Sequence, residues 1–150
     1  MTPQPTAGSV VQRTALIALG VLVLDAGTKA AALLIGSRHY GQGIILPVQN
    51  PDFSLGVASA AFPIMLALST LGILVFGSYT AWAAARGVLP AWIPGLLIGG
   101  GIGNLADRLL FGAVHDWLDL GIVVVNLADL AVLIGLLGYF ACLAFTRRRS

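Results

Sequence analysis

The sequence predicts an all-α polytopic membrane protein with four transmembrane helices and a small β-sheet on its outer surface. Of 150 residues, 58% are hydrophobic and 9% are charged, whereas a soluble domain carries about 25% charged residues. The apolar residues form four runs, each close to the ~20 residues that a helix needs to cross a bilayer. The chain is therefore expected to form a single membrane-embedded domain over residues 1–150.

The four predicted spans cover residues 15–35, 61–85, 89–110 and 121–145. We expect helices because a lipid-exposed backbone must satisfy its own hydrogen bonds, and a β-barrel would need short alternating segments instead. Pro63 falls in the first turn of the second span, where proline is tolerated. The first span contains Asp25 and Lys29 and is too long for the apolar core of a signal peptide, so we expect it to be retained.

Basic residues orient these spans. Arg13, Arg86 and Arg147–Arg149 fall before the first span, between the second and third, and after the fourth. The positive-inside rule makes that side cytoplasmic, so both termini are expected inside. The outer side then receives the loops 36–60 and 111–120. The first loop contains "GQGIILPVQNPDFSLG", a short β-like run among turn residues, which predicts the sheet.

Glycines in the third span are spaced for helix packing. Gly95, Gly99 and Gly103 lie four residues apart, and small residues at this spacing let helix backbones approach closely. The pattern favours a packing seam over a phosphate-binding loop, because no Lys-Ser or Lys-Thr pair follows the glycines.

Ionisable residues inside a membrane span are costly and default to functional candidates. Asp25 and Lys29 lie four residues apart on one helix face, so they can form an ion pair. Lys29 could instead receive a substrate headgroup or stabilise the site. Asn50 and Asp52 lie in the first outer loop, where the sequence alone favours turn residues.

A second polar group ends the third span. Asn104 and Arg108 share a helix face at i, i+4. Asp107 is expected to pair with Arg108 or with a neighbouring helix. Asp119 in the second outer loop is expected to be solvated or to cap a helix.

Two further carboxyl groups are predicted to meet near the outer surface. Asp116 follows the third span, and Asp129 lies with Asn126 in the first turns of the fourth. Because these spans are antiparallel, their outer ends are adjacent. Two carboxylates in a low-dielectric site share one proton, which suits water activation as in aspartic proteases. A proton relay in a transporter uses the same pair, so the residues alone leave both functions open.

No cofactor or metal is expected. His39 and His115 lie in outer loops without a third ligand at metal spacing, and Cys142 is the chain's single cysteine. The chain also lacks a basic stripe with interleaved aromatics, which argues against a nucleic-acid partner.

Four ordered motifs resemble those of the lipoprotein signal peptidase (signal peptidase II) family. They are "LDAGTK", "NPDFSLG", "GGGIGNLADRLLFGAVHDW" and "VNLAD", and together they span nearly the whole chain. The resemblance implies an intramembrane aspartyl endopeptidase of the bacterial cytoplasmic membrane, with an extracytoplasmic β-cradle and an active site near that face. It would remove signal peptides from diacylglyceryl-modified prolipoproteins without a cofactor.

The resemblance also implies residue roles. The catalytic dyad falls on Asp116 and Asp129. Supporting and substrate-binding positions fall on Asp25, Lys29, Asn50, Gly100, Asn104, Arg108, Asn126 and Ala128. The expected partners are prolipoprotein substrates and membrane lipids, and the protein is expected to be a monomer.

Two departures from the family pattern affect substrate contacts. The segment between Asp116 and Asp129 is short, so a flap over the site is expected to be trimmed. Asp52 stands where a small residue is common, and Leu55 where Phe is common. An inactive homologue that binds lipidated peptide is a further alternative to a peptidase.

Overall fold

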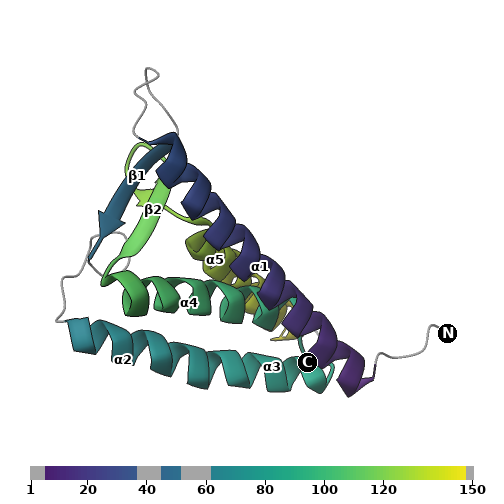
Figure 1. The fold of residues 1–150 in the computed structure, drawn as a ribbon. Coiled ribbons are helices and arrows are strands. Elements are labelled where there is room, and N and C mark those ends of the chain that lie inside the picture. Colours follow the sequence, from purple (N-terminus) through teal and green to yellow (C-terminus); the bar gives the residue numbers. More distant parts are fainter. Residues whose placement is uncertain (1–5, 37–44, 52–61, 148–150) are drawn as a thin grey trace.

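The computed structural model describes residues 6–36, 45–51 and 62–147, which form a helical bundle with a small β-sheet at one end (Figure 1). In chain order the elements are α1 (Ala7–Ile35), β1 (Ile45–Asn50), α2 (Phe62–Gly72), the π-helical turn η1 (Ile73–Gly77), α3 (Ser78–Ala85), α4 (Trp92–Phe111), β2 (Val114–Asp119), β3 (Val124–Val125) and α5 (Leu127–Arg147). The start of α1 and the end of α5 lie away from the sheet (Figure 1).

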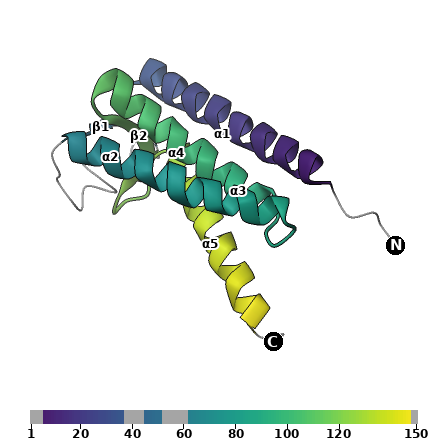
Figure 2. The ribbon, with the colours of Figure 1, turned by 90° about the horizontal axis from the view of Figure 1, so that it is seen from below.

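Helix α4 is the centre of the bundle, with α1 and α5 packed on it and the α2–α3 rod alongside (Figure 2). Its glycines make these contacts possible. A methyl group at Gly99 would lie 2.7 Å from the Ala18 backbone oxygen of α1, and one at Gly100 would lie 2.5 Å from the Ala128 oxygen of α5. The packing seam predicted from the glycine spacing is therefore confirmed.

Two helix boundaries differ from the prediction. Helix α1 begins at Ala7 rather than at residue 15, because the Thr6 side chain caps it and accepts a hydrogen bond from the Ser9 backbone N–H at 3.3 Å. Residues 121–126 were predicted to be helical and are not. Strand β3 occupies part of that segment, and α5 begins only at Leu127.

Among the described helices, three are long and apolar enough to cross a membrane: Ala7–Ile35, Phe62–Ala85 and Leu127–Phe145. Helix α4 is less apolar, because five of its residues are glycines and its last three turns carry Asn104, Asp107 and Arg108. Asp107 and Arg108 are buried within the bundle, so α4 does not present a uniformly apolar surface. The fourth span and the orientation in the membrane stay predictions.

The sheet has three antiparallel strands in the order β1-β2-β3. Val48 pairs with Asp116 and Asn50 with Val114 between β1 and β2, while Leu118 pairs with Val125 between β2 and β3. The sequence predicted a sheet in the first outer loop, yet of the described strands only β1 comes from that loop. Strand β2 lies in the second outer loop, and β3 lies at the start of the predicted fourth span. Val114 is buried, and a buried backbone needs hydrogen-bond partners, which β1 supplies.

Replacement of Gly99 tests the seam between α1 and α4. Gly99→Ala forces a methyl group against Ala18 and Val21, and we expect it to lower the free energy of unfolding by about 1–3 kcal/mol. Gly20→Ala is the matched control, since no atom lies within 4 Å of the added methyl group. Thermal unfolding in detergent micelles measures both; equal stability of the two variants would contradict the seam.

Candidate active site

Both candidate catalytic carboxylates contact one residue, Asn126. Its side-chain Nδ2 donates to Asp116 Oδ1 at 2.7 Å, and its backbone N–H donates to Asp129 Oδ2 at 3.2 Å. Asn126 is fully buried, and Asp116 is 3% exposed. The two carboxyl groups that the sequence predicted to meet are thus both hydrogen-bonded to a single residue, Asn126.

A tight hairpin delivers these residues. Strand β2 carries Asp116, and the chain turns back between Leu120 and Val123, whose backbone groups are joined by a 2.9 Å hydrogen bond. Gly121 has a left-handed φ of 85°, and its N–H donates to Asp119 Oδ1 at 2.7 Å. Asp119 therefore stabilises the turn. The short segment between Asp116 and Asp129, which was predicted to trim the flap, leads through β3 directly into α5.

The start of α5 fixes the orientation of Asn126. The Asn126 Oδ1 accepts the Asp129 backbone N–H at 2.9 Å, while the Asp129 side chain accepts the Asn126 N–H. This reciprocal pair is a capping box. Since the Asn126 oxygen is occupied by the helix, its amide nitrogen is directed at Asp116.

Asn104 positions Asp129 in a similar way, through a hydrogen bond from its side-chain amide. Its Nδ2 donates to Asp129 Oδ1 at 2.7 Å, and its Oδ1 accepts from Asn126 Nδ2 at 3.0 Å and from Lys29 Nζ at 3.5 Å. One turn along α4, Arg108 Nη1 donates to the Asn104 backbone oxygen at 3.4 Å. The shared face predicted for Asn104 and Arg108 is confirmed.

Asn50 approaches Asp116 from the other side. It is the last residue of β1, and its Nδ2 donates to Asp116 Oδ2 at 3.0 Å. The turn role that the local sequence favoured for Asn50 is wrong. Pairing of β1 with β2 brings Asn50 next to Asp116, which lies 66 residues further along the chain. Asp52, Leu55, His39 and Arg148–Arg149 lie outside the described residues.

A buried ion cluster supports this arrangement from α1. Lys29 Nζ lies 2.6 Å from Asp25 Oδ2 and 3.0 Å from Asp107 Oδ2. The predicted Asp25–Lys29 pair is confirmed, and of the two partners expected for Asp107 the neighbouring helix α1 supplies an ion pair through Lys29. Asp25 Oδ1 also accepts the Ala128 backbone N–H at 3.0 Å, which is one of the N–H groups that α5 cannot satisfy internally.

Asp107 is a site residue absent from the predicted set. Its Oδ2 accepts the His115 backbone N–H at 2.9 Å, next to Asp116 in β2. It therefore ties the strand that carries Asp116 to the Lys29 cluster. The sequence offered one signal that Asp107 belongs to the site, namely its place one residue before Arg108 in a buried helix end. Its contact with β2 depends on tertiary structure.

The surroundings of Asp116 favour its protonated form. Burial raises the pKa of the Asp116 carboxyl above its usual range; the hydrogen bond from Asn50 opposes this shift, and the nearby Asp129 charge adds to it. A carboxyl group in this state can donate a proton at neutral pH.

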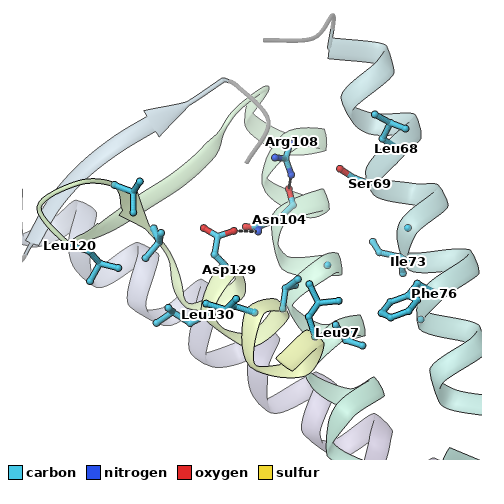
Figure 3. Close-up of a pocket in the computed structure, with 18 residues that line it drawn as sticks. Leu68, Ser69, Ile73, Phe76, Leu97, Asn104, Arg108, Leu120, Asp129 and Leu130 are labelled. Carbon is cyan, nitrogen blue, oxygen red and sulfur yellow. Dashed lines mark hydrogen bonds between the residues drawn. The ribbon is translucent and has the colours of Figure 1, made fainter. Parts of the chain in front are cut away.

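A cavity of about 540 Å³ opens beside Asp129 (Figure 3). Asp129, Asn104 and Arg108 form its polar end, while α2, η1, α4 and α5 supply walls that are mostly apolar. Figure 3 shows Asp129 and Asn104 on one side and Ile73 and Phe76 on the other. The site thus combines a hydrogen-bonded acid pair with space for an apolar ligand.

The fold and this site define a class: helical membrane proteins with a paired-carboxylate site at one end of the bundle. Two solved structures of bacterial membrane enzymes share the fold. One aligns with a TM-score of 0.73 over 91% of each chain at 22% identity. The other aligns with a TM-score of 0.69 over 87% of this chain at 23% identity.

Sequence comparisons identify the family. The profile of the family described as Signal peptidase (SPase) II matches residues 17–145. The lipoprotein signal peptidase of Pelotomaculum thermopropionicum is 37% identical over 126 residues, covering 77% of this chain and 80% of the relative. That of Staphylococcus carnosus is 31% identical over 150 residues, covering 91% and 93%. The chain belongs to the signal peptidase II family, which confirms the resemblance of its motifs.

Removal of the Lys29 charge tests the ion cluster. Lys29→Met leaves Asp25 and Asp107 buried without their cation, and breaking a buried ion pair costs about 3–5 kcal/mol. We expect a matching loss of thermal stability in detergent. Arg13→Met, at an exposed position of the same helix, is the control with little effect; similar melting temperatures for both variants would reject the cluster's structural role.

Proposed function

We propose that the protein is an aspartyl endopeptidase that removes signal peptides from diacylglyceryl-modified prolipoproteins, with Asp116 and Asp129 as its catalytic dyad. The observation that carries this proposal is the convergence of both carboxyl groups on Asn126. Family membership supplies the substrate class, and the apolar cavity beside Asp129 suits a lipid-linked peptide.

In the first step, a water molecule between the carboxyl groups attacks the scissile carbonyl carbon. The Asp129 carboxylate accepts a proton from the water, and the protonated Asp116 donates its proton to the carbonyl oxygen. The product is a neutral tetrahedral intermediate. The raised pKa of Asp116 supports its role as the resting proton donor.

In the second step, the intermediate collapses. Asp129 returns its proton to the leaving amide nitrogen, the C–N bond breaks, and Asp116 recovers a proton from one hydroxyl group. Each carboxyl group has then regained its starting state. Asn104, Asn126 and Asn50 each donate an N–H to the dyad, so they hold both acids in place while protons move.

The proposal includes a site near the extracytoplasmic face of the inner membrane. It is supported by the position of the dyad at the sheet end of the bundle, away from the start of α1 near Arg13 (Figure 1). The proposal takes a monomer as the active unit.

Substitution of each dyad carboxyl group tests the chemistry. We expect Asp116→Asn and Asp129→Asn each to abolish cleavage of a diacylated prolipoprotein peptide, because neither amide can exchange the proton. Asp119→Asn is the matched control, since Asp119 only accepts a hydrogen bond in the hairpin turn. A gel-shift assay with purified protein measures cleavage, and thermal unfolding checks folding.

Full activity in either dyad variant would reject the assignment. Tight binding of the diacylated peptide by the wild-type protein without cleavage would instead identify a binding protein. Proton-coupled uptake into liposomes, again without cleavage, would identify a transporter.

The pH profile tests the role of Asp116. Activity requires its proton, so kcat/KM falls as pH rises through the pKa of Asp116, which burial holds above the usual range. The Asn50 hydrogen bond favours the ionised form. We therefore expect Asn50→Ala to raise this pKa further and to move the alkaline limb to higher pH. Gln49→Ala is the control, because Gln49 contacts His115. A shift to lower pH in Asn50→Ala would contradict the assignment.

A further inference from the structure

The side chain of His115 lies on the back of the strand that carries Asp116. Successive side chains of a strand point to opposite faces, so the imidazole is directed away from the Asp116 carboxyl group. Gln49 pairs with His115 on this rear face, whereas Asn50 reaches Asp116 on the front face. The His115 side chain is 11% exposed, and it is not among the residues that line the cavity beside Asp129. Its position therefore suits an action on Asp116 through the strand.

Two side chains of α4 form the surface on which the imidazole packs. Asp107 and Phe111 lie four residues apart, so they share one face of the helix. The Phe111 ring meets the imidazole edge to face, with ring centroids 5.0 Å apart, an arrangement that aromatic rings favour. Gly112 ends α4 with a left-handed φ of 76°, and the chain turns back there so that His115 contacts the helix it has just left.

His115 brings two nitrogen atoms close to one oxygen of Asp107. Its backbone N–H donates to Asp107 Oδ2 at 2.9 Å, and its imidazole Nδ1 lies 3.5 Å from the same oxygen. Lys29 Nζ lies 3.0 Å from that oxygen, so α1 holds the carboxylate in place. A single hydrogen bond would allow the strand to rotate about that bond. Attachment through both the main chain and the side chain opposes such a rotation.

The surroundings of the imidazole favour a proton on Nδ1. The Gln49 amide nitrogen lies 3.5 Å from His115 Nε2, and an amide nitrogen donates hydrogen bonds but accepts none. Nε2 is therefore the acceptor of this pair, which leaves Nδ1 to carry the ring proton. An ionised carboxylate only accepts hydrogen bonds, so Asp107 favours the same tautomer from the other side of the ring.

We propose that His115 is a positioning residue, whose Nδ1–H group, directed at Asp107, keeps β2 in the rotation that aims Asp116 at Asn126. This inference rests on the proposed peptidase function and adds a residue to it. Asn126 Nδ2 lies 2.7 Å from Asp116 Oδ1. A rotation of the strand would lengthen this hydrogen bond and move the proton donor away from the scissile carbonyl group. Displacement of a reacting group by about 1 Å can lower a rate by about 10²-fold.

Three substitutions of His115 separate the roles of its two ring nitrogens. In His115→Asn the amide nitrogen replaces Nδ1 and can still donate to Asp107. In His115→Gln the amide lies further out, near the place of Nε2, and His115→Leu has no polar group. For a diacylated prolipoprotein peptide we expect kcat to fall about tenfold or more in H115Q and H115L and to stay within about threefold of wild type in H115N. KM should stay unchanged in all three, because His115 does not line the cavity.

Gln49→Ala is the matched control, since it removes only the contact with Nε2 and should keep the wild-type kcat. Thermal unfolding in detergent checks folding. We expect H115L to remain folded, because Asp107 keeps its contacts with Lys29 and with the strand backbone. Wild-type kcat in H115L would overturn the proposal. So would an equal loss in all three variants, which would show that the ring acts through its volume, or a rise in KM with kcat unchanged.

NMR spectroscopy tests the contact without the reaction. The chain has two histidines, and the shifts of their ring nitrogens distinguish protonated from unprotonated atoms. The signals that disappear in H115N belong to His115. We expect a proton on its Nδ1, and an unprotonated Nδ1 would overturn the proposal.

The positioning role and the peptidase function fail in different ways. If the wild type cleaves the peptide, Asp129→Asn does not, and all three His115 variants match the wild type, only the positioning role is rejected. If the wild type and Asp129→Asn are equally inactive, the peptidase proposal itself is rejected, and the positioning role falls with it.

Discussion

The site depends on how the N-terminus of α5 is satisfied inside the protein. The first N–H groups of a helix lack internal partners, and leaving them unpaired in a buried site is costly. Here Asn126 accepts the Asp129 N–H, and Asp25 of α1 accepts the Ala128 N–H. An intramembrane carboxylate such as Asp25 is therefore explained by helix capping as well as by its ion pair with Lys29, because the positive end of the helix favours a negative charge there.

The hydrogen bonds that cap α5 also determine which side-chain atoms of the neighbouring asparagines face the proposed dyad. An asparagine side chain offers one acceptor and one donor group, and at this site a structural partner occupies each acceptor. The α5 backbone takes the Asn126 oxygen, and Lys29 lies near the Asn104 oxygen. Each amide nitrogen is thus directed at one carboxyl group, Asp116 or Asp129. An aspartate in either place would add a charge and lose the donor, so the two asparagines position the acids without changing their charge.

The parts of this site that follow local periodicity were predictable from the sequence. The Asp25–Lys29 pair and the glycine seam of α4 each depend on residues four apart on one helix. The contact of Asn50 with Asp116 depends on strand pairing across 66 residues, which no local pattern encodes. The late start of α5 was missed for a related reason: the apolar run 121–125 suits a helix or a strand equally, and pairing of Leu118 with Val125 decides for the strand.

Charged side chains lie close to the proposed dyad. Lys29 is held between Asp25 and Asp107, and its charge also favours the ionised form of Asp116. Arg108 lies in the field of Asp129 and Asp116 and can balance one ionised carboxylate of that pair. Like-charge repulsion and desolvation would both disfavour a second ionised carboxylate in a buried site. One proton on the pair is the state that the proposed water activation requires.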